Sequence, residues 1–174
     1  MRSAPLPRSA EALGIPGRET AAAALLIISA LLWLGLLLGV SFLATPVKFM
    51  ADSLTVPVAL DVGRHTFGVF SYVEIALAII LFISLTAARA GRAVTVAAVT
   101  LGVLVALQAL WMLPVMDARV DLIMQGGTPP AARLHEIYIA FELSKLGLLV
   151  FVARRGFVAY VRAVHPAAAA THSD

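Results

Sequence analysis

Long apolar stretches alternate along the chain with short segments that contain charged residues, Gly and Pro. The apolar stretches cover residues 21–47, 66–88, 93–116 and 135–153. A helix needs about 20 consecutive, predominantly apolar residues to cross a bilayer, and a regular sheet cannot expose its edge to lipid. The pattern therefore predicts an all-α fold, a polytopic membrane protein built as a four-transmembrane-helix bundle.

The segments outside these stretches predict the ends and loops of the bundle. Residues 1–20 and 154–174 are expected to be tails without fixed structure, and residues 48–64 a loop lying along the interface. Pro46 is expected to end or kink the first helix, because proline lacks the amide donor and disfavours helical geometry at the preceding residue. Residues 125–130, QGGTPP, predict a clear break before the last span.

The distribution of basic residues predicts the orientation. Eight of the 13 Lys and Arg residues lie in the two tails and the turn at residues 89–92, and four lie in the other two loops. Because cytoplasmic loops carry an excess of Lys and Arg, we expect both termini in the cytoplasm, and the protein in the bacterial inner (cytoplasmic) membrane.

Composition narrows the class of partner and of chemistry. Hydrophobic residues make up 61% of the chain and charged residues only 13%, against about 25% charged in soluble domains. The net charge is only +3 and no basic stripe occurs, so we expect the lipid bilayer and no nucleic acid as a partner. The chain has no Cys, which excludes disulfides, thiolate metal sites and Cys nucleophiles. A homodimer or another membrane protein is a further expected partner.

The last span carries an unusual stripe of polar side chains. His135, Tyr138, Glu142 and Lys145 share one face of a helix. A charged group at bilayer depth costs about 2.5–3.5 kcal/mol, so these groups are expected to face protein, water or each other. The predicted intramembrane polar site joins this stripe to one polar residue from each of two other spans: Glu74, Gln108, Tyr138, Glu142 and Lys145.

Two interpretations of this polar site stay open. It can be a proton or cation relay, or a group that polarises a ligand, since intramembrane ionisable residues commonly serve function. It can also be an interhelical ion pair that only fixes the bundle, and Glu142 and Lys145, three residues apart, can neutralise each other.

An internal repeat relates the two halves of the chain. Pro46 and Pro114 are separated by 68 residues, and Glu74 and Glu142 have the same separation. This predicts two copies of a helical hairpin in the same orientation. The two glutamates are then expected at similar depth.

Two further candidate features lie outside this stripe. His and Asp residues near the outer ends of the spans form a possible site for a divalent metal, with interfacial caps and salt bridges to arginine as the alternative: His65, His135, Asp61, Asp117 and Asp121. Gly35 and Gly39, four residues apart in the first span, predict close helix packing.

Three stretches resemble the DUF4149 / TMEM205-like family of integral membrane proteins. They are LWLGLLLGVSFLATPVKF (32–49), DVGRHTFGVFSYVEI (61–75) and LHEIYIAFELSKL (134–146). The resemblance extends over about residues 25–151 and rests on these positions: Trp33, Gly35, Pro46, Phe49, Gly63, Phe67, Phe70, Tyr72 and His135. It implies a four-helix membrane bundle and little chemistry. The chain departs from the family at Glu142, Ser144 and Lys145, where Ser- and Asn-rich positions are usual.

Three functions are therefore considered. The first is handling of a proton, metal ion or small solute, with Glu74, Glu142 and Lys145 in the path and His135 at its mouth. The second is a structural or accessory subunit that docks through the face of Gly35 and Gly39. The third, which we rank last, is a small metal- or haem-dependent membrane enzyme. No phosphate loop or nucleophile elbow occurs.

Overall fold

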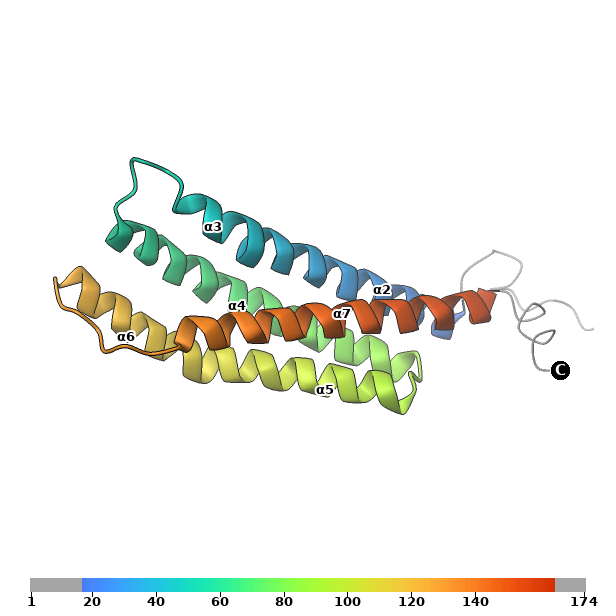
Figure 1. The fold of residues 1–174 in the computed structure, drawn as a ribbon. Helices are drawn as coiled ribbons and strands as arrows, with labels where there is room; N and C mark the ends of the chain where they lie inside the picture. Colours follow the sequence, from blue (N-terminus) through green and yellow to red (C-terminus); the bar gives the residue numbers. More distant parts are fainter. Residues whose placement is uncertain (1–16, 165–174) are drawn as a thin grey trace, which may run out of the picture.

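The structure, a computed structural model, describes residues 17–164, and all regular elements within them are helical (Figure 1). In chain order the elements are α2 (Arg18–Leu37), η1 (Leu38–Ala44), α3 (Thr45–Lys48), α4 (Val56–Ala87), α5 (Arg92–Leu107), η2 (Gln108–Met112), α6 (Leu113–Met124) and α7 (Leu134–Val164). The elements η1 and η2 are π-helical and join the helices on either side without a break. The expected tail residues 1–16 and 165–174 lie outside the described residues, whereas α7 continues through 154–164.

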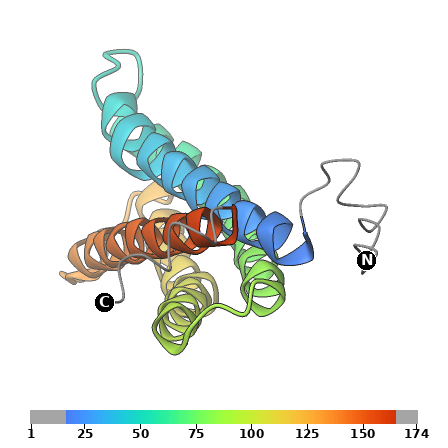
Figure 2. The same cartoon turned by 90° about the vertical axis from the view of Figure 1, so that its right-hand side faces the viewer.

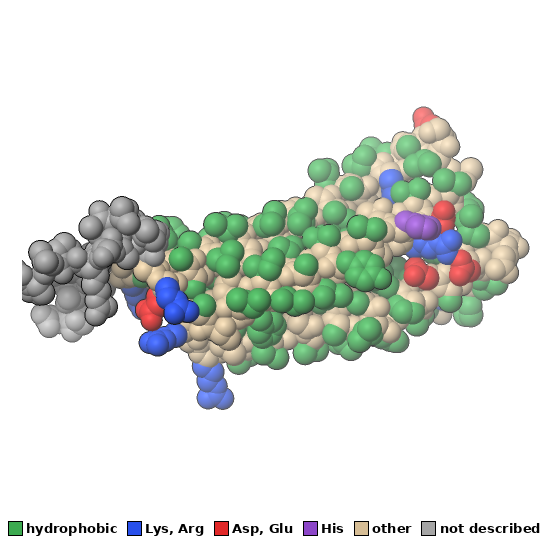
Figure 3. Space-filling view, turned by 180° about the vertical axis from the view of Figure 1, so that it is seen from behind, with side chains coloured by type: hydrophobic (Ala, Val, Ile, Leu, Met, Phe, Trp, Pro, Cys, Tyr) green, Lys and Arg blue, Asp and Glu red, His purple; other side chains and the backbone are tan. Residues whose placement is uncertain are grey.

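The helices run side by side along one long axis (Figures 1 and 2). α7 packs along α2 and α5, and α4 packs against α2 and α5 from the other side. Figure 3 shows a broad belt of hydrophobic side chains between two ends where charged groups gather. In the described part of the chain, three helical segments are long and apolar enough to cross a membrane: Arg18–Lys48, Val56–Ala87 and Arg92–Met124. This supports a membrane protein, with α7 as a further long helix that carries more charge.

Two helices extend beyond the predicted spans. α4 begins at Val56 rather than near Thr66, and the predicted loop after residue 116 is helical as far as Met124. Pro57 favours the earlier start, because proline fits the first helical turn, where its missing N–H is not needed. The break that the sequence predicts at 125–130 is confirmed, and Gly126 adopts the left-handed φ of 79° there.

The helix does not end at Pro46 or at Pro114 but passes through each proline by way of a π-helical segment. The Thr45 N–H donates to the Val40 carbonyl, and the Leu113 N–H donates to the Gln108 carbonyl. The wider turn removes the conflict between the proline and the regular hydrogen-bond ladder of the preceding turn. These two hydrogen bonds are 68 residues apart, like the two prolines; the internal repeat stays a prediction.

The close contact between α2 and α7 depends on Gly156, which no sequence motif had indicated. A Cβ added at Gly156 would lie 3.0 Å from Ile27 Cγ1 and 3.5 Å from Leu26 Cδ2. At Gly35 and Gly39, by contrast, an added Cβ would meet no described atom within 4 Å. Gly35 and Gly39 therefore do not pack closely against a described helix of this chain, because α7 approaches α2 on a different face; close packing against another chain stays a prediction.

Candidate functional site

One buried ammonium group joins the helices. Lys145 Nζ, on α7, lies 2.6 Å from Glu74 Oε1 of α4 and 2.7 Å from Glu142 Oε1 of its own helix. The Lys145 side chain is fully buried, and the two glutamates are 1–2% exposed. The structure thus brings together three residues of the predicted polar site, Glu74, Glu142 and Lys145.

Each carboxylate of this network also accepts neutral donors. Trp33 Nε1 of α2 donates to Glu74 Oε1 at 2.9 Å. Gln108 Nε2 of η2 donates to Glu142 Oε1 at 2.7 Å, and Ser41 Oγ of η1 donates to Glu142 Oε2 at 2.7 Å. Hydrogen bonds to charged groups contribute about 1.5–3 kcal/mol each, so these donors offset part of the cost of burying the ions.

The donors to Glu142 come from the two π-helical segments. Ser41 lies in η1 and Gln108 lies in η2. A π-segment rotates the following side chains relative to a regular helix, and such segments are frequent at functional sites. Each π-helical segment therefore precedes a proline and also contains a side chain, Ser41 or Gln108, that donates a hydrogen bond to Glu142.

The buried network has one more carboxylate than ammonium. Its charged members are Glu74, Glu142 and Lys145, and among residues 17–164 no other Lys, Arg or His side chain lies within salt-bridge distance of either carboxylate. An uncompensated charge in a low-dielectric interior is unfavourable by several kcal/mol. A proton or a further cation bound at one carboxylate would remove this surplus. In addition, Gln108 Oε1 is a buried acceptor with no hydrogen-bond partner in the described chain.

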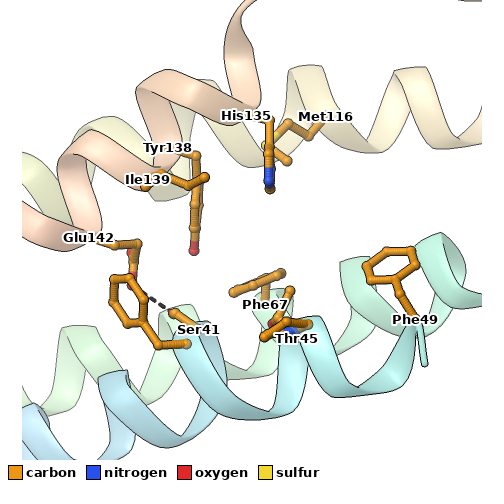
Figure 4. A pocket seen from close by; sticks show the side chains of 11 residues that line it. Ser41, Thr45, Phe49, Phe67, Met116, His135, Tyr138, Ile139 and Glu142 are labelled. Atoms are coloured by element: carbon orange, nitrogen blue, oxygen red, sulfur yellow. Dashed lines mark hydrogen bonds between the residues drawn. The ribbon is translucent and has the colours of Figure 1, made fainter. Parts of the chain in front are cut away.

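A cavity of about 450 Å³ reaches Glu142 from one end of the molecule. Its walls are mostly apolar and come from η1, α3, α4, α6 and α7; the lining residues are Ser41, Phe42, Thr45, Pro46, Phe49, Phe67, Met116, His135, Tyr138, Ile139 and Glu142. Figure 4 shows Tyr138 and His135 pointing from α7 toward Phe67 and Thr45 on the opposite wall. A largely apolar cavity with a few convergent polar groups is the usual form of a ligand site.

Glu142 and Ser41 lie together on one side of this cavity, and His135 lies farther from them on α7 (Figure 4). Tyr138 stands between them, with its ring edge-on to Phe67 at 5.2 Å between centroids. On the far side of the aromatic wall, Lys48 Nζ lies 5.1 Å from the Phe49 ring centroid and 6.0 Å from that of Phe67. The aromatic faces of this wall are thus within range of a cation.

The side of the network away from the cavity is closed. Beyond Glu74 and Trp33 the helices enclose an apolar core that includes Leu26, Leu77 and Leu81. These leucines are at most 6% exposed. The cavity that Glu142 lines therefore lies on the opposite side of the network from this packed core.

The predicted metal set is not assembled. Arg64 pairs with Asp61 and Asp121 across α4 and α6, and His65 Nδ1 lies 2.9 Å from the Asp61 carbonyl oxygen. His135 instead lines the cavity. Among residues 17–164 no group of three or more His, Asp or Glu side chains is placed to hold a metal ion. The alternative of salt bridges with arginine describes Asp61 and Asp121 better, because Arg64 lies between them and pairs with both.

Three residues of the site escaped the sequence analysis: Trp33, Ser41 and Phe67. Trp33 and Phe67 had been named only as positions of the family resemblance. The available signal was the paired Thr-Pro and Leu-Pro steps at Pro46 and Pro114, each closely preceded by a polar residue, Ser41 or Gln108.

Comparison of the chain with protein-family models, with curated proteins and with solved structures found no match. The resemblance to DUF4149 / TMEM205-like proteins therefore stays a prediction.

Proposed function

We propose that this chain is a membrane protein that takes up a proton, or a small cationic solute in its place, at Glu142. The observation that carries the proposal is the double position of Glu142. Its Oε1 belongs to the buried network with Lys145 and Gln108, while the residue also lines the cavity. A carboxylate in this position can bind and release a cation from the cavity, and the change in charge then acts on the buried network.

The net charge of the buried network favours a cationic ligand at Glu142. Two carboxylates share one ammonium, so a positive guest at Glu142 restores neutrality, whereas an anionic guest would add to the surplus. The rings of Phe42, Phe49 and Phe67 in the cavity wall favour a cation that carries apolar groups. In this proposal α7 is the fourth span, and the arginine-rich end faces the cytoplasm.

In this proposal uptake takes place from one face of the membrane only, because the other side of the network is closed by packed side chains. Leu26, Leu77 and Leu81, packed beyond Glu74, support a carrier or a receptor rather than an open channel. Four helices around a packed core leave no continuous path.

Proton uptake is tested in vesicles that contain the purified protein and a pH-sensitive dye, with a membrane potential imposed to drive protons. We expect a proton flux for the wild type and, for Glu142→Gln, the flux of protein-free vesicles. Glu136→Gln is the matched control, because Glu136 is exposed on the same helix and pairs only with Arg133 at 3.8 Å. An equal flux in wild type and Glu142→Gln, with Glu142→Gln still folded by circular dichroism, contradicts proton uptake.

The organic-cation arm uses phenyltrimethylammonium and its neutral isostere tert-butylbenzene. We expect Trp33 fluorescence in a Trp111→Phe background to respond to the cation and not to the isostere, because only the cation restores neutrality next to the network that contains Trp33. The response should vanish in Glu142→Gln. Equal responses to both compounds contradict a cation site.

A further inference from the structure

A second groove lies at the opposite end of the molecule from the cavity. It has a volume of about 280 Å³ and runs between α2, the turn that joins α4 to α5, and the C-terminal half of α7. Three arginines line it, Arg89, Arg155 and Arg162. Arg155 and Arg162 are seven residues apart on α7, so they share one helix face.

The arginines of this groove have few acidic partners. Arg89 lies 3.4 Å from Glu19, and both side chains are largely exposed. No salt bridge is found for Arg155 or Arg162 within residues 17–164. The groove therefore carries a net positive charge that the described chain does not neutralise.

The groove wall is apolar beneath the arginines. Leu26 of α2 and Val94 of α5 are nearly fully buried at its base, and Val158 and Ala159 of α7 complete the lining. The close packing of Gly156 on Leu26 brings α7 near enough to form this wall. Cationic groups over an apolar wall match a ligand that has an anionic head and an apolar tail.

The groove also lies where a lipid headgroup is found. Arg18, Arg92 and Arg154 lie at the same end of the helices, and Figure 3 shows basic side chains gathered at this end of the hydrophobic belt. Basic pockets between helices on the cytoplasmic side bind anionic lipid headgroups, and the planar guanidinium group matches phosphate oxygens in bidentate geometry.

We propose that this groove binds an anionic phospholipid, with its phosphate held by Arg155 and Arg162 and completed by Arg89, and with its acyl chain along the apolar wall. The site is independent of Glu142 and its cavity.

The test is lipid retention by the purified protein in neutral detergent, followed by native mass spectrometry with phosphatidylglycerol and phosphatidylcholine as probes. We expect wild type to retain phosphatidylglycerol selectively. Arg155→Gln/Arg162→Gln should weaken retention by about 30-fold, the loss expected for two basic contacts at an anionic membrane surface. The matched control is Arg92→Gln/Arg154→Gln, which removes the same charge at the same end from residues that do not line the groove.

Three outcomes would overturn the proposal. Equal losses in the two double variants would mean general attraction of lipid to a basic surface. Equal retention of both lipids by wild type would remove the requirement for an anionic head. Displacement of phosphatidylglycerol by an equal concentration of glycerol phosphate would assign the site to a soluble anion, because the apolar wall would then contribute nothing. Unfolding curves of all variants accompany the assay to exclude loss of the fold as a cause.

Discussion

Glu74 and Glu142 bind the same ammonium group from opposite sides but lie in different surroundings. Glu74 Oε1 accepts both Lys145 Nζ and Trp33 Nε1, and apolar side chains close the space around it. Glu142 accepts donors on both of its oxygens and also lines a cavity. The two residues occupy equivalent positions of the proposed repeat, 68 residues apart.

The difference between the two glutamates comes from the neighbouring helices and not from the residues themselves. Glu142 faces both π-helical segments, whose donors Ser41 and Gln108 are turned toward it. Toward their ends η1 and α3 lie apart from α7 (Figure 1), and the cavity occupies this region. Glu74 instead meets Trp33, a bulky side chain from a regular stretch of α2 that fills the available space. Both carboxylates are therefore nearly fully buried, but Glu74 is enclosed by packed side chains whereas Glu142 borders a cavity.

The largest expected effect follows from removing the group that both glutamates share. Lys145→Met keeps the side-chain length but leaves two buried carboxylates without a cation, so we expect the free energy of unfolding to fall by about 3–5 kcal/mol. The measurement is reversible unfolding in mixed micelles followed by circular dichroism. Ser144→Ala is the control, because Ser144 is exposed and bonds only to the Ala140 carbonyl. A loss no larger than that of the control would mean that the ion network does not hold the helices together.

Exchanging each glutamate for glutamine separates their roles. Glu74→Gln should lower the free energy of unfolding by about 1.5–3 kcal/mol, the contribution of a hydrogen bond to a charged group, and Glu142→Gln should lower it less, because the cavity can hydrate the amide. The affinity for phenyltrimethylammonium should change in the reverse order. Binding should be lost in Glu142→Gln and only weakened in Glu74→Gln, where Lys145 then pairs with Glu142 alone.

The two measurements are made on the same protein samples, with unfolding in micelles and binding from Trp33 fluorescence. Identical behaviour of the two variants in both would show that the cavity confers no special role on Glu142. The two glutamates would then differ in their position in the structure but not in their role.

The smallest expected effects concern the contacts between helices away from the network. Gly156→Leu should destabilise by about 1–3 kcal/mol, because its side chain would overlap Leu26 and Ile27. Gly35→Leu should leave stability unchanged or slightly raised, since the site is open in this chain and leucine favours a helix over glycine. Unfolding in micelles measures both. A loss for Gly35→Leu as large as for Gly156→Leu would indicate that another chain packs against the face of Gly35.

Much of the polar site was predictable because polar side chains in an apolar helix are unfavourable toward lipid and must face other helices. Glu74, Gln108, Glu142 and Lys145 stand out in their stretches, and the cost of exposing charge to lipid requires that they meet. The five residues of the predicted metal site do not come together, because no comparable cost requires them to meet. His65 and His135 lie near helix ends, where side chains can reach water or arginine, so their grouping in sequence does not require contact in space.

By itself, the sequence determined the helical class, the apolar belt, the break at residues 125–130 and the membership of the buried ion network. Apolar length and the cost of burying charge are local or nearly local properties, so they can be derived from the order of residues. Only the tertiary structure decided that Lys145 lies between both glutamates, that Gly156 and not Gly35 permits close packing, and that Glu142 alone borders a cavity. These features depend on how each helix is rotated toward its neighbours, and the π-helical turns before Pro46 and Pro114 alter that rotation in a way that a regular 3.6-residue period does not predict.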